Sequence, residues 1–240
     1  MRLTTDDLRL TTNDLRLTTD DLRLMTTPRL LIATTNTNKV REIRELLDGA
    51  GVELVTLDGW PGLAAPEETG FTFEENARAK ALYYAAATGE LTVAEDSGLA
   101  IDALDGAPGV ESARFGGVDL PYPEKFARID AALRAKGERE SAARFVCALA
   151  LVRGDRVLFE TRGTIEGRIA PEPKGQGGFG YDPIFFYPPY DQTLAEAGDA
   201  KAAVSHRGEA FRALKAFLAS DSDRLHHERH ETKQRHEKET

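Results

Sequence analysis

The chain has 240 residues, 41% of them hydrophobic, which is enough for one large domain or two small ones around a packed core. Its 31 Lys and Arg residues are outnumbered by 40 Asp and Glu residues, and the net charge of −9 argues against a broad nucleic-acid-binding surface. We find neither an apolar run of the roughly 20 residues that span a bilayer nor a cleavable leader, so we expect a cytoplasmic protein without membrane contacts.

Both ends of the chain differ from the rest. Residues 1–24 repeat the heptapeptide RLTTDDL, but the leucines alternate by five and two positions rather than by the three and four of a coiled-coil seam. An odd period also turns a strand over at every copy, so we expect a disordered extension. Residues 221–240 are charged and rich in histidine, which predicts a disordered tail that could chelate a metal weakly. The working domain is then expected at 25–220.

Predicted strands and helices alternate between these ends. We expect strands at 29–34, 52–57, 91–94, 143–152, 156–168 and 184–187, and helices at 40–47, 72–88, 122–136 and 208–218. Thr72 and Glu75 have the spacing of a capping box, which supports the second helix. The single cysteine, Cys147, lies in an apolar strand, where we expect a buried residue rather than a reactive thiol. The order of elements predicts an α/β fold, a mixed sheet covered by helices.

A polar segment joins the first strand to the first helix. It consists of Thr34, Thr35, Asn36, Thr37, Asn38 and Lys39. Backbone N–H groups at a helix N-terminus favour anions and Lys39 adds a positive charge, so the segment is a candidate phosphate site. It lacks the glycines of a P-loop, and a capped helix with a polar connection explains the same residues equally well.

Two pairs of adjacent acids, Glu67-Glu68 and Glu95-Asp96, are candidates for a magnesium site. Adjacent carboxylates repel each other unless a positive charge lies between them, and Mg²⁺ prefers a few hard oxygen ligands together with phosphate and water. Solvated loop acids are the alternative for the first pair. Asp96 is expected at the carboxyl end of the strand at 91–94, which favours a functional role for it.

A glycine-rich loop at 175–183 contains two aromatic residues, Phe179 and Tyr181, and an acid, Asp182. Glycines permit a close approach of the backbone, and the aromatic rings offer faces for a flat ligand ring. Lys201 and His206 follow at the start of the last helix. His206 is the only histidine of the working domain and could equally be a capping or packing residue.

Five segments of the chain carry most of its polar motifs. In chain order they are LLIATTNTNKVREIRELL, EETGFTFEENARAKA, AEDSGLAIDALDGAPGVESARFGG, GGFGYDPIFF and KAAVSHRG. In this order they closely resemble the inosine triphosphate pyrophosphatase family. The resemblance spans about residues 29–218 and includes neither end. It implies an elongated mixed α/β fold with two lobes, an active site in the cleft between them, and a homodimer.

The resemblance also implies magnesium-dependent hydrolysis of non-canonical purine nucleoside triphosphates (ITP, dITP, XTP and dXTP) to the monophosphate and pyrophosphate. It assigns the catalytic position to Asp96 and the metal-binding positions to Glu67 and Asp96. The nucleotide-contacting positions fall on the segment 34–39, and on Lys80, Ser97, Phe179, Gly180, Tyr181, Asp182, Lys201, His206 and Arg207. The family usually has Gly where this chain has Thr35, which leaves the geometry of the first loop open.

These roles fit the chemistry of the residues. Asp96 can accept a proton from a water, and Lys39 or Lys80 can neutralise the leaving pyrophosphate. Arg207 and Lys201 can only donate hydrogen bonds, which suits the C6 carbonyl of hypoxanthine and xanthine better than the amino group of adenine. Two other classes remain open: a non-catalytic purine nucleotide-binding or sensing module, and a phosphotransferase, which would release no pyrophosphate.

Overall fold

The computed structural model describes residues 27–221. The extension predicted at 1–24 and the tail predicted at 221–240 lie outside this range, except for Asp221. No helix within the described range is long and apolar enough to cross a membrane.

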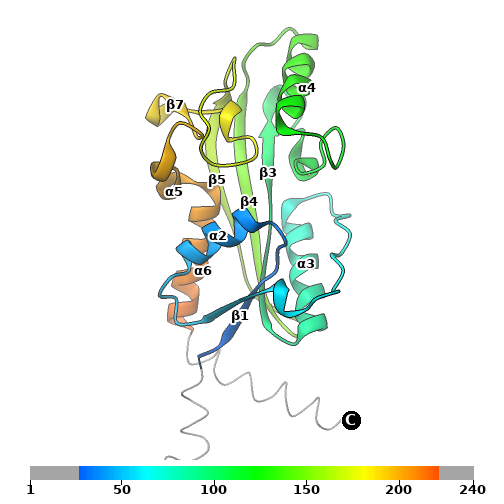
Figure 1. The fold of residues 1–240 in the computed structure, drawn as a ribbon, viewed down its shortest axis with the longest axis vertical. Helices are drawn as coiled ribbons and strands as arrows, with labels where there is room; N and C mark the ends of the chain where they lie inside the picture. Colours follow the sequence, from blue (N-terminus) through cyan, green and yellow to red (C-terminus); the bar gives the residue numbers. More distant parts are fainter. Residues whose placement is uncertain (1–26, 222–240) are drawn as a thin grey trace, which may run out of the picture.

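The strands of the described range form one mixed sheet of seven, in the order β2-β1-β3-β4-β5-β6-β7. The mixed sheet is as predicted, with one strand more than the six expected. The strands are β1 (Arg29–Ile32), β2 (Glu53–Thr56), β3 (Leu91–Ile101), β4 (Ala142–Arg153), β5 (Arg156–Ile169), β6 (Phe185–Tyr187) and β7 (Gln192–Thr193). β1 is parallel to both β2 and β3, whereas the pairs from β3 to β7 are antiparallel. The long strands β3, β4 and β5 run through most of the elongated molecule (Figure 1).

The helices of the described range are α2 (Thr37–Leu46), α3 (Phe73–Thr88), α4 (Tyr122–Ala135), α5 (Lys201–Val204) and α6 (His206–Ser220). Figure 1 shows α2 and α6 on one side of the long strands and α3 on the other. We call this part of the molecule, with β1 and β2, the terminal lobe, because residues 27 and 221 both lie in it. The distal lobe contains α4, β6 and β7. The predicted two-lobed α/β architecture is therefore confirmed.

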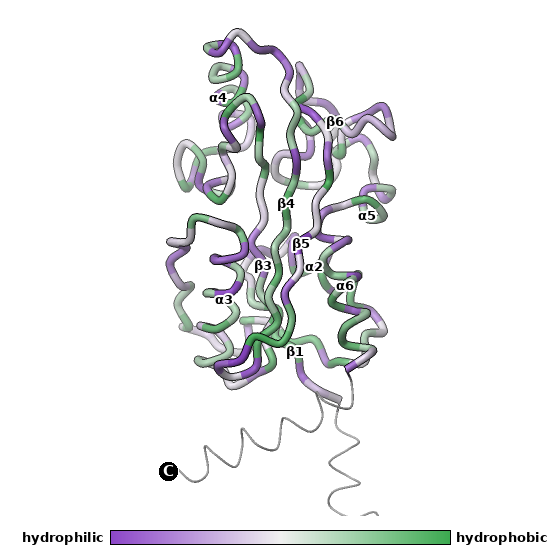
Figure 2. The backbone as a smooth tube through the Cα atoms, turned by 180° about the vertical axis from the view of Figure 1, so that it is seen from behind, coloured by the Kyte–Doolittle hydropathy of each residue, from purple (hydrophilic) through white to green (hydrophobic). Residues whose placement is uncertain are grey.

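The alternation of side chains along β4 places two cores on the two faces of the sheet. Cys147, Leu149 and Leu151 pack in the cluster that contains Phe211 and Leu214 of α6. The intervening residues Val146, Ala148 and Ala150 pack in clusters with α3. β4 is hydrophobic along most of its length because both of its faces are covered (Figure 2).

The capping box predicted for α3 is present. The Thr72 hydroxyl accepts a hydrogen bond from the Glu75 backbone at 3.1 Å, and the Glu75 carboxylate accepts one from the Thr72 backbone at 3.2 Å. Gly89 ends the helix with a left-handed φ of 71°, a conformation that suits glycine. These local signals fix both ends of α3.

β3 is longer than predicted. The sequence suggested a strand only at 91–94, but β3 continues to Ile101 because its residues from Thr92 onward stay paired with β4. Asp96 is therefore in the middle of a strand and not at its carboxyl end, which corrects the prediction.

β1 is what ends at this point. It pairs with β3 only as far as Ile32 and Val93, followed by a hydrogen bond from the Ala33 N–H to the Val93 carbonyl at 2.9 Å. Beyond Val93 the edge of β3 has no parallel neighbour, and it opens between the two lobes.

Candidate active site

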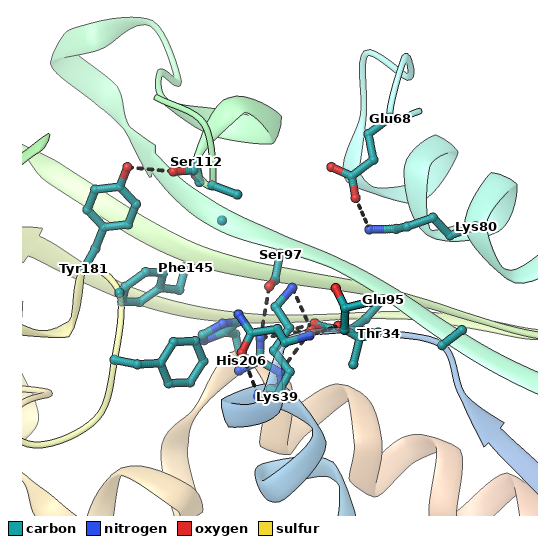
Figure 3. A pocket seen from close by; sticks show the side chains of 18 of the residues that line it. Thr34, Lys39, Glu68, Lys80, Glu95, Ser97, Ser112, Phe145, Tyr181 and His206 are labelled. Atoms are coloured by element: carbon teal, nitrogen blue, oxygen red, sulfur yellow. Dashed lines mark hydrogen bonds and ion pairs between the residues drawn. The ribbon is translucent and has the colours of Figure 1, made fainter. Parts of the chain in front are cut away.

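A cavity of about 280 Å³ lies at this open edge and is lined by residues of both lobes. In Figure 3 Glu68 and Lys80 lie on one side of β3, and Lys39, Glu95 and His206 lie on the other. Most of the predicted site residues line it: Thr34, Thr35, Asn36, Lys39, Lys80, Ser97, Phe179, Gly180, Tyr181, Asp182, Lys201, His206 and Arg207. Thr37, Asn38 and Glu67 do not line it. Asp96 is also absent from the lining, but it contacts Lys80, which is part of it.

The first loop turns the N-terminus of α2 toward the cavity. The Asn36 side chain caps the helix, since its Oδ1 accepts hydrogen bonds from the backbone N–H groups of Asn38 at 3.0 Å and Lys39 at 3.2 Å. Thr37 and Asn38 form the first turn of the helix. In the described range the only non-glycine residues with a positive φ are Asp105 and Asp191, so the backbone at Thr35 does not require glycine.

Glu95 lies at the centre of a buried charge cluster on the α6 face of β3. Its Oε1 is 3.0 Å from Lys39 Nζ and 3.1 Å from Arg207 Nη2. Burial alone would raise the pKa of Glu95, but the charges of Arg207 and Lys39 outweigh it and hold the pKa well below its usual range. Glu95 is therefore ionised, and it keeps two cations beside the cavity.

Asp96 faces α3 on the opposite side of the same strand. Its Oδ2 accepts a hydrogen bond from Asn76 Nδ2 at 3.0 Å, and its Oδ1 is 3.4 Å from Lys80 Nζ. Burial raises the pKa of Asp96 and Lys80 only partly opposes this. A carboxylate with a raised pKa and a nearby cation is suited to accept a proton.

Glu68 and not Glu67 turns toward Asp96. Glu68 forms an ion pair with Lys80, and Arg114 of the distal lobe reaches it at 3.3 Å. Burial opposes ionisation of Glu68, but the charge of Lys80 lowers its pKa. Glu67 is exposed. The geometry thus favours Glu68 where the sequence pointed to Glu67, because the neighbouring cations hold the second acid of the pair inward.

The donor set around Lys80 fits a magnesium ion. In the described range no three His, Cys, Asp or Glu side chains gather around one metal position. Mg²⁺ does not need such a cluster, since it commonly takes one or two carboxylates and completes its shell with phosphate oxygens and water. Glu68 and Asp96 both face the Lys80 ammonium and supply such oxygens.

The ring of Phe179 lines the distal part of the cavity and lies close to two cations. Lys201 Nζ is 4.8 Å and Arg207 Cζ 5.5 Å from its ring centre. Asp182 holds this loop: it accepts a hydrogen bond from the Phe179 backbone at 2.8 Å and pairs with Lys201 at 2.7 Å. Gly178 is required here, because its φ is +69° and a Cβ would lie 2.1 Å from Asp182.

His206 is buried and stacks on Phe145, with ring centres 4.9 Å apart. Its Nδ1 is the one fully buried side-chain nitrogen or oxygen of the described residues that lacks a hydrogen-bond partner. Burial lowers the pKa of His206 well below its usual value, and the charge of Arg207 adds to this. His206 is therefore a neutral imidazole at the cavity wall and not a cation.

Most of the donors of Arg207 are already occupied, and one Nη1 hydrogen remains beyond its contacts in the described range. Its guanidinium binds Glu95, contacts Glu42 Oε2 at 2.7 Å, and donates to Ser97 Oγ at 3.0 Å. Glu42 also contacts Lys201 at 3.3 Å. The sequence analysis overlooked Glu42, although it follows Lys39 by three residues and so lies on the same side of α2. That spacing was the available signal.

Comparisons with known proteins agree with one another. The model of the Ham1 family matches residues 30–217. A dITP/XTP pyrophosphatase of an Exiguobacterium species is 48% identical over 194 residues, which cover 79% of this chain and 96% of that protein. The corresponding protein of Gloeobacter violaceus is 49% identical over 191 residues, covering 77% of this chain and 91% of that protein.

Solved structures are similar as well. A HAM1 protein from Coxiella burnetii superposes with a TM-score of 0.76 at 38% identity, covering 80% of this chain and 99% of that one. A dITP/XTP pyrophosphatase from Mycobacterium abscessus superposes with a TM-score of 0.61 at 40% identity, covering 78% and 97%.

Proposed function

Because the chain belongs to the Ham1 family, we propose that it is a nucleoside triphosphate pyrophosphatase that hydrolyses non-canonical purine nucleotides (ITP, dITP, XTP and dXTP) to the monophosphate and pyrophosphate. The observation that carries this proposal is the pair Glu95 and Asp96 at the open edge of β3. One holds cations on the α6 face, and the other has a raised pKa on the α3 face. We assign the pyrophosphatase domain to residues 25–220.

Asp96 is the proposed proton acceptor. As a carboxylate beside Lys80 at the edge of the cavity, it can take up the proton of an attacking water. Asn76 fixes its Oδ2, leaving Oδ1 toward Lys80. Lys39, Lys80 and the N-terminus of α2 would neutralise the charge of the triphosphate, and Ser97 adds a hydroxyl beside them.

Glu68 and Asp96 are the proposed holders of Mg²⁺. The ion, when bound, supplies positive charge to the phosphate oxygens and lowers the pKa of a bound water. The protein itself supplies the rigid frame for these two carboxylates, because Arg114 and Lys80 anchor Glu68 and Asn76 anchors Asp96.

The purine base is proposed to bind over Phe179. Lys201 lies near the ring of Phe179 and contacts two carboxylates, those of Glu42 and Asp182. Its ammonium has three N–H groups, so one donor is left for the base. Tyr181 and Gly180 line the same wall of the cavity. Donors at this wall suit a C6 carbonyl, and they would leave the amino group of adenine without an acceptor.

The alternative is a non-catalytic purine nucleotide-binding or sensing module. Such a module would need Lys39 and Phe179 but neither Glu68 nor Asp96. Burying an acid beside other charges has an energetic cost that binding alone does not require, so the presence of both acids in this geometry favours hydrolysis.

We also propose that the protein forms a homodimer and acts in the cytoplasm. Phe71 (93% exposed) and Val118 (78% exposed) are large apolar residues that such an assembly would cover.

Product analysis tests the proposal. ITP is incubated with the protein and Mg²⁺, and IMP, IDP, pyrophosphate and phosphate are separated by chromatography. We expect equal amounts of IMP and pyrophosphate, and no products when EDTA removes the metal. ATP and GTP in parallel reactions measure selectivity, and Asp96→Asn is the matched control. Binding of ITP without turnover would support the sensing module, and transfer to an acceptor without pyrophosphate would support a phosphotransferase.

A further inference from the structure

Cys147 makes a contact that a buried apolar residue could not make. Its Sγ is 2.8 Å from Glu95 Oε2, and the residue is fully buried on the α6 face of β4. Cys147 lies directly across from Ser97 in the register of β3 and β4, and Ser97 itself lines the cavity. The thiol therefore reaches the charge cluster of the candidate active site from the neighbouring strand β4, on the same face of the sheet.

The two oxygens of Glu95 have different tasks. Oε1 takes the closest contacts of both cations, at 3.0 Å from Lys39 and 3.1 Å from Arg207. Oε2 has the thiol as its closest partner, with Arg207 Nη2 farther away at 3.3 Å. The thiol adds a neutral donor at Oε2 to a carboxylate that Arg207 contacts at both oxygens, and so helps to keep Oε1 directed at the cations.

The thiol is protonated and so acts as the donor. Burial and the charge of Glu95 both raise the pKa of Cys147, which keeps the hydrogen on the sulfur. A thiol is a weak donor, but the acceptor here is a carboxylate that is paired with Lys39 and Arg207 in a buried place, where hydrogen bonds are stronger.

We propose that Cys147 is a positioning residue, which holds Glu95 so that Lys39 and Arg207 meet the nucleotide in the correct place. This inference rests on the proposed function and extends its site to a residue that touches no substrate. A core cysteine without this role would be replaceable by any apolar residue of similar size.

Two pairs of variants separate the hydrogen bond from packing. Cys147→Ser and Cys147→Ala differ by a hydroxyl, and Cys147→Thr and Cys147→Val form a second pair of equal shape. We expect the apolar member of each pair to lower kcat/KM for ITP about tenfold, mainly through KM, since one hydrogen bond to a charged group is lost. The hydroxyl member should recover most of it, even where its melting temperature is lower.

Leu151→Ala is the matched control. Leu151 is fully buried on the same strand and in the same cluster, but its partner in β3 is Val93, two residues before Glu95, and its side chain has no polar group to offer Glu95. This variant should lose stability and keep its kinetic constants at a temperature where it is folded. The inference would be overturned if Cys147→Ser and Cys147→Thr were no more active than Cys147→Ala and Cys147→Val. It would also be overturned if the Ala and Val variants kept the kinetic constants of the wild type.

A spectroscopic measurement is independent of activity. The chain contains one cysteine, so its infrared S–H stretching band belongs to Cys147 alone. We expect this band at a lower frequency than for a thiol in an apolar core, and a shift to higher frequency in Glu95→Gln. If the wild type cleaved no ITP but the band showed the hydrogen bond, the proposed function would fail while the contact stood. A band at the position of an unbonded thiol would refute the positioning role itself.

Discussion

Glu95 and Asp96 are neighbours in the chain, yet their carboxylates lie on opposite faces of β3 and their pKa values shift in opposite directions. Glu95 contacts Lys39 and Arg207, whose charges overcome its burial and lower its pKa. Asp96 contacts Asn76 and Lys80, and burial raises its pKa. Consecutive residues of a strand alternate in direction, so one dipeptide supplies both a fixed anion and a candidate base.

Asp96→Asn is expected to lower turnover of ITP by about 10²- to 10⁴-fold, the usual range for the loss of one general base. The melting temperature should stay the same or rise slightly, because burial disfavours the charged form that Asn replaces. Steady-state kinetics measure the turnover of the variant and the wild type, and thermal unfolding measures their melting temperatures. Near-normal turnover in a folded variant would remove Asp96 from the mechanism.

Glu68→Gln and Glu67→Gln form a matched pair for the metal site. Glu68 lines the cavity beside Lys80, whereas Glu67 is exposed. We expect Glu68→Gln to raise the Mg²⁺ concentration for half-maximal activity by about tenfold or more, the range typical of weakened metal sites. Glu67→Gln should change it less than about twofold. A magnesium titration of the activity of both variants distinguishes the two assignments. A larger effect of Glu67→Gln than of Glu68→Gln would restore the assignment made from the sequence.

Arg207→Ala is expected to raise KM for ITP and to reduce the ratio of kcat/KM for ITP to that for ATP. It should also destabilise the fold by about 3–5 kcal/mol, because Glu95 would remain buried with less positive charge around it. Urea unfolding measures the second effect, and kinetics at low temperature measure the first. An unchanged ratio in folded protein would show that Arg207 orders Glu95 and Glu42 without influencing base selection.

His206→Phe tests how the buried imidazole couples stability to pH. Burial keeps His206 neutral in the folded chain, whereas the unfolded chain binds a proton below the ordinary pKa of 6.5. The unfolded state then binds more protons, so stability falls as the pH drops below that value, by up to about 1.4 kcal/mol per pH unit.

The variant should lose this dependence while its ring keeps the stack on Phe145. Urea unfolding near pH 5 and near pH 8 measures the difference. Phe211→Leu, on the same helix, is the control and should lower stability equally at both values. The same pH dependence in wild type and His206→Phe would show that His206 takes up a proton in the folded state.

Deletion of residues 1–24 is expected to leave the melting temperature and the activity unchanged. The spacing of leucines in the repeat fits neither a coiled coil nor a strand, and the family match begins only at residue 30. Kinetics and calorimetry on the shortened chain are the measurement. A drop of several degrees would assign the extension to the folded domain.

Local signals in the sequence were sufficient for most helices and strands. The Thr72 and Glu75 capping box, the apolar period of α6 and the turn at Gly154 each act within a few residues, so they can be recognised without the fold. Ordered motifs placed the chain in its family for the same reason: they are continuous in sequence. β7 and α5 were missed because two and four residues are too short to form a recognisable period.

What the sequence alone could not decide was which side chains meet. Whether Glu67 or Glu68 turns inward depends on Lys80 and Arg114, which come from α3 and from the distal lobe. The engagement of Arg207 by Glu95, and of Glu95 by Cys147, depends on residues 52 to 112 positions apart. The site itself exists because β1 ends at Ile32 while β3 continues to Ile101, which leaves an open edge. Local propensity and periodicity determine where elements form, but the relative lengths and register of paired strands are set only when the sheet assembles, and these decide which charges become neighbours.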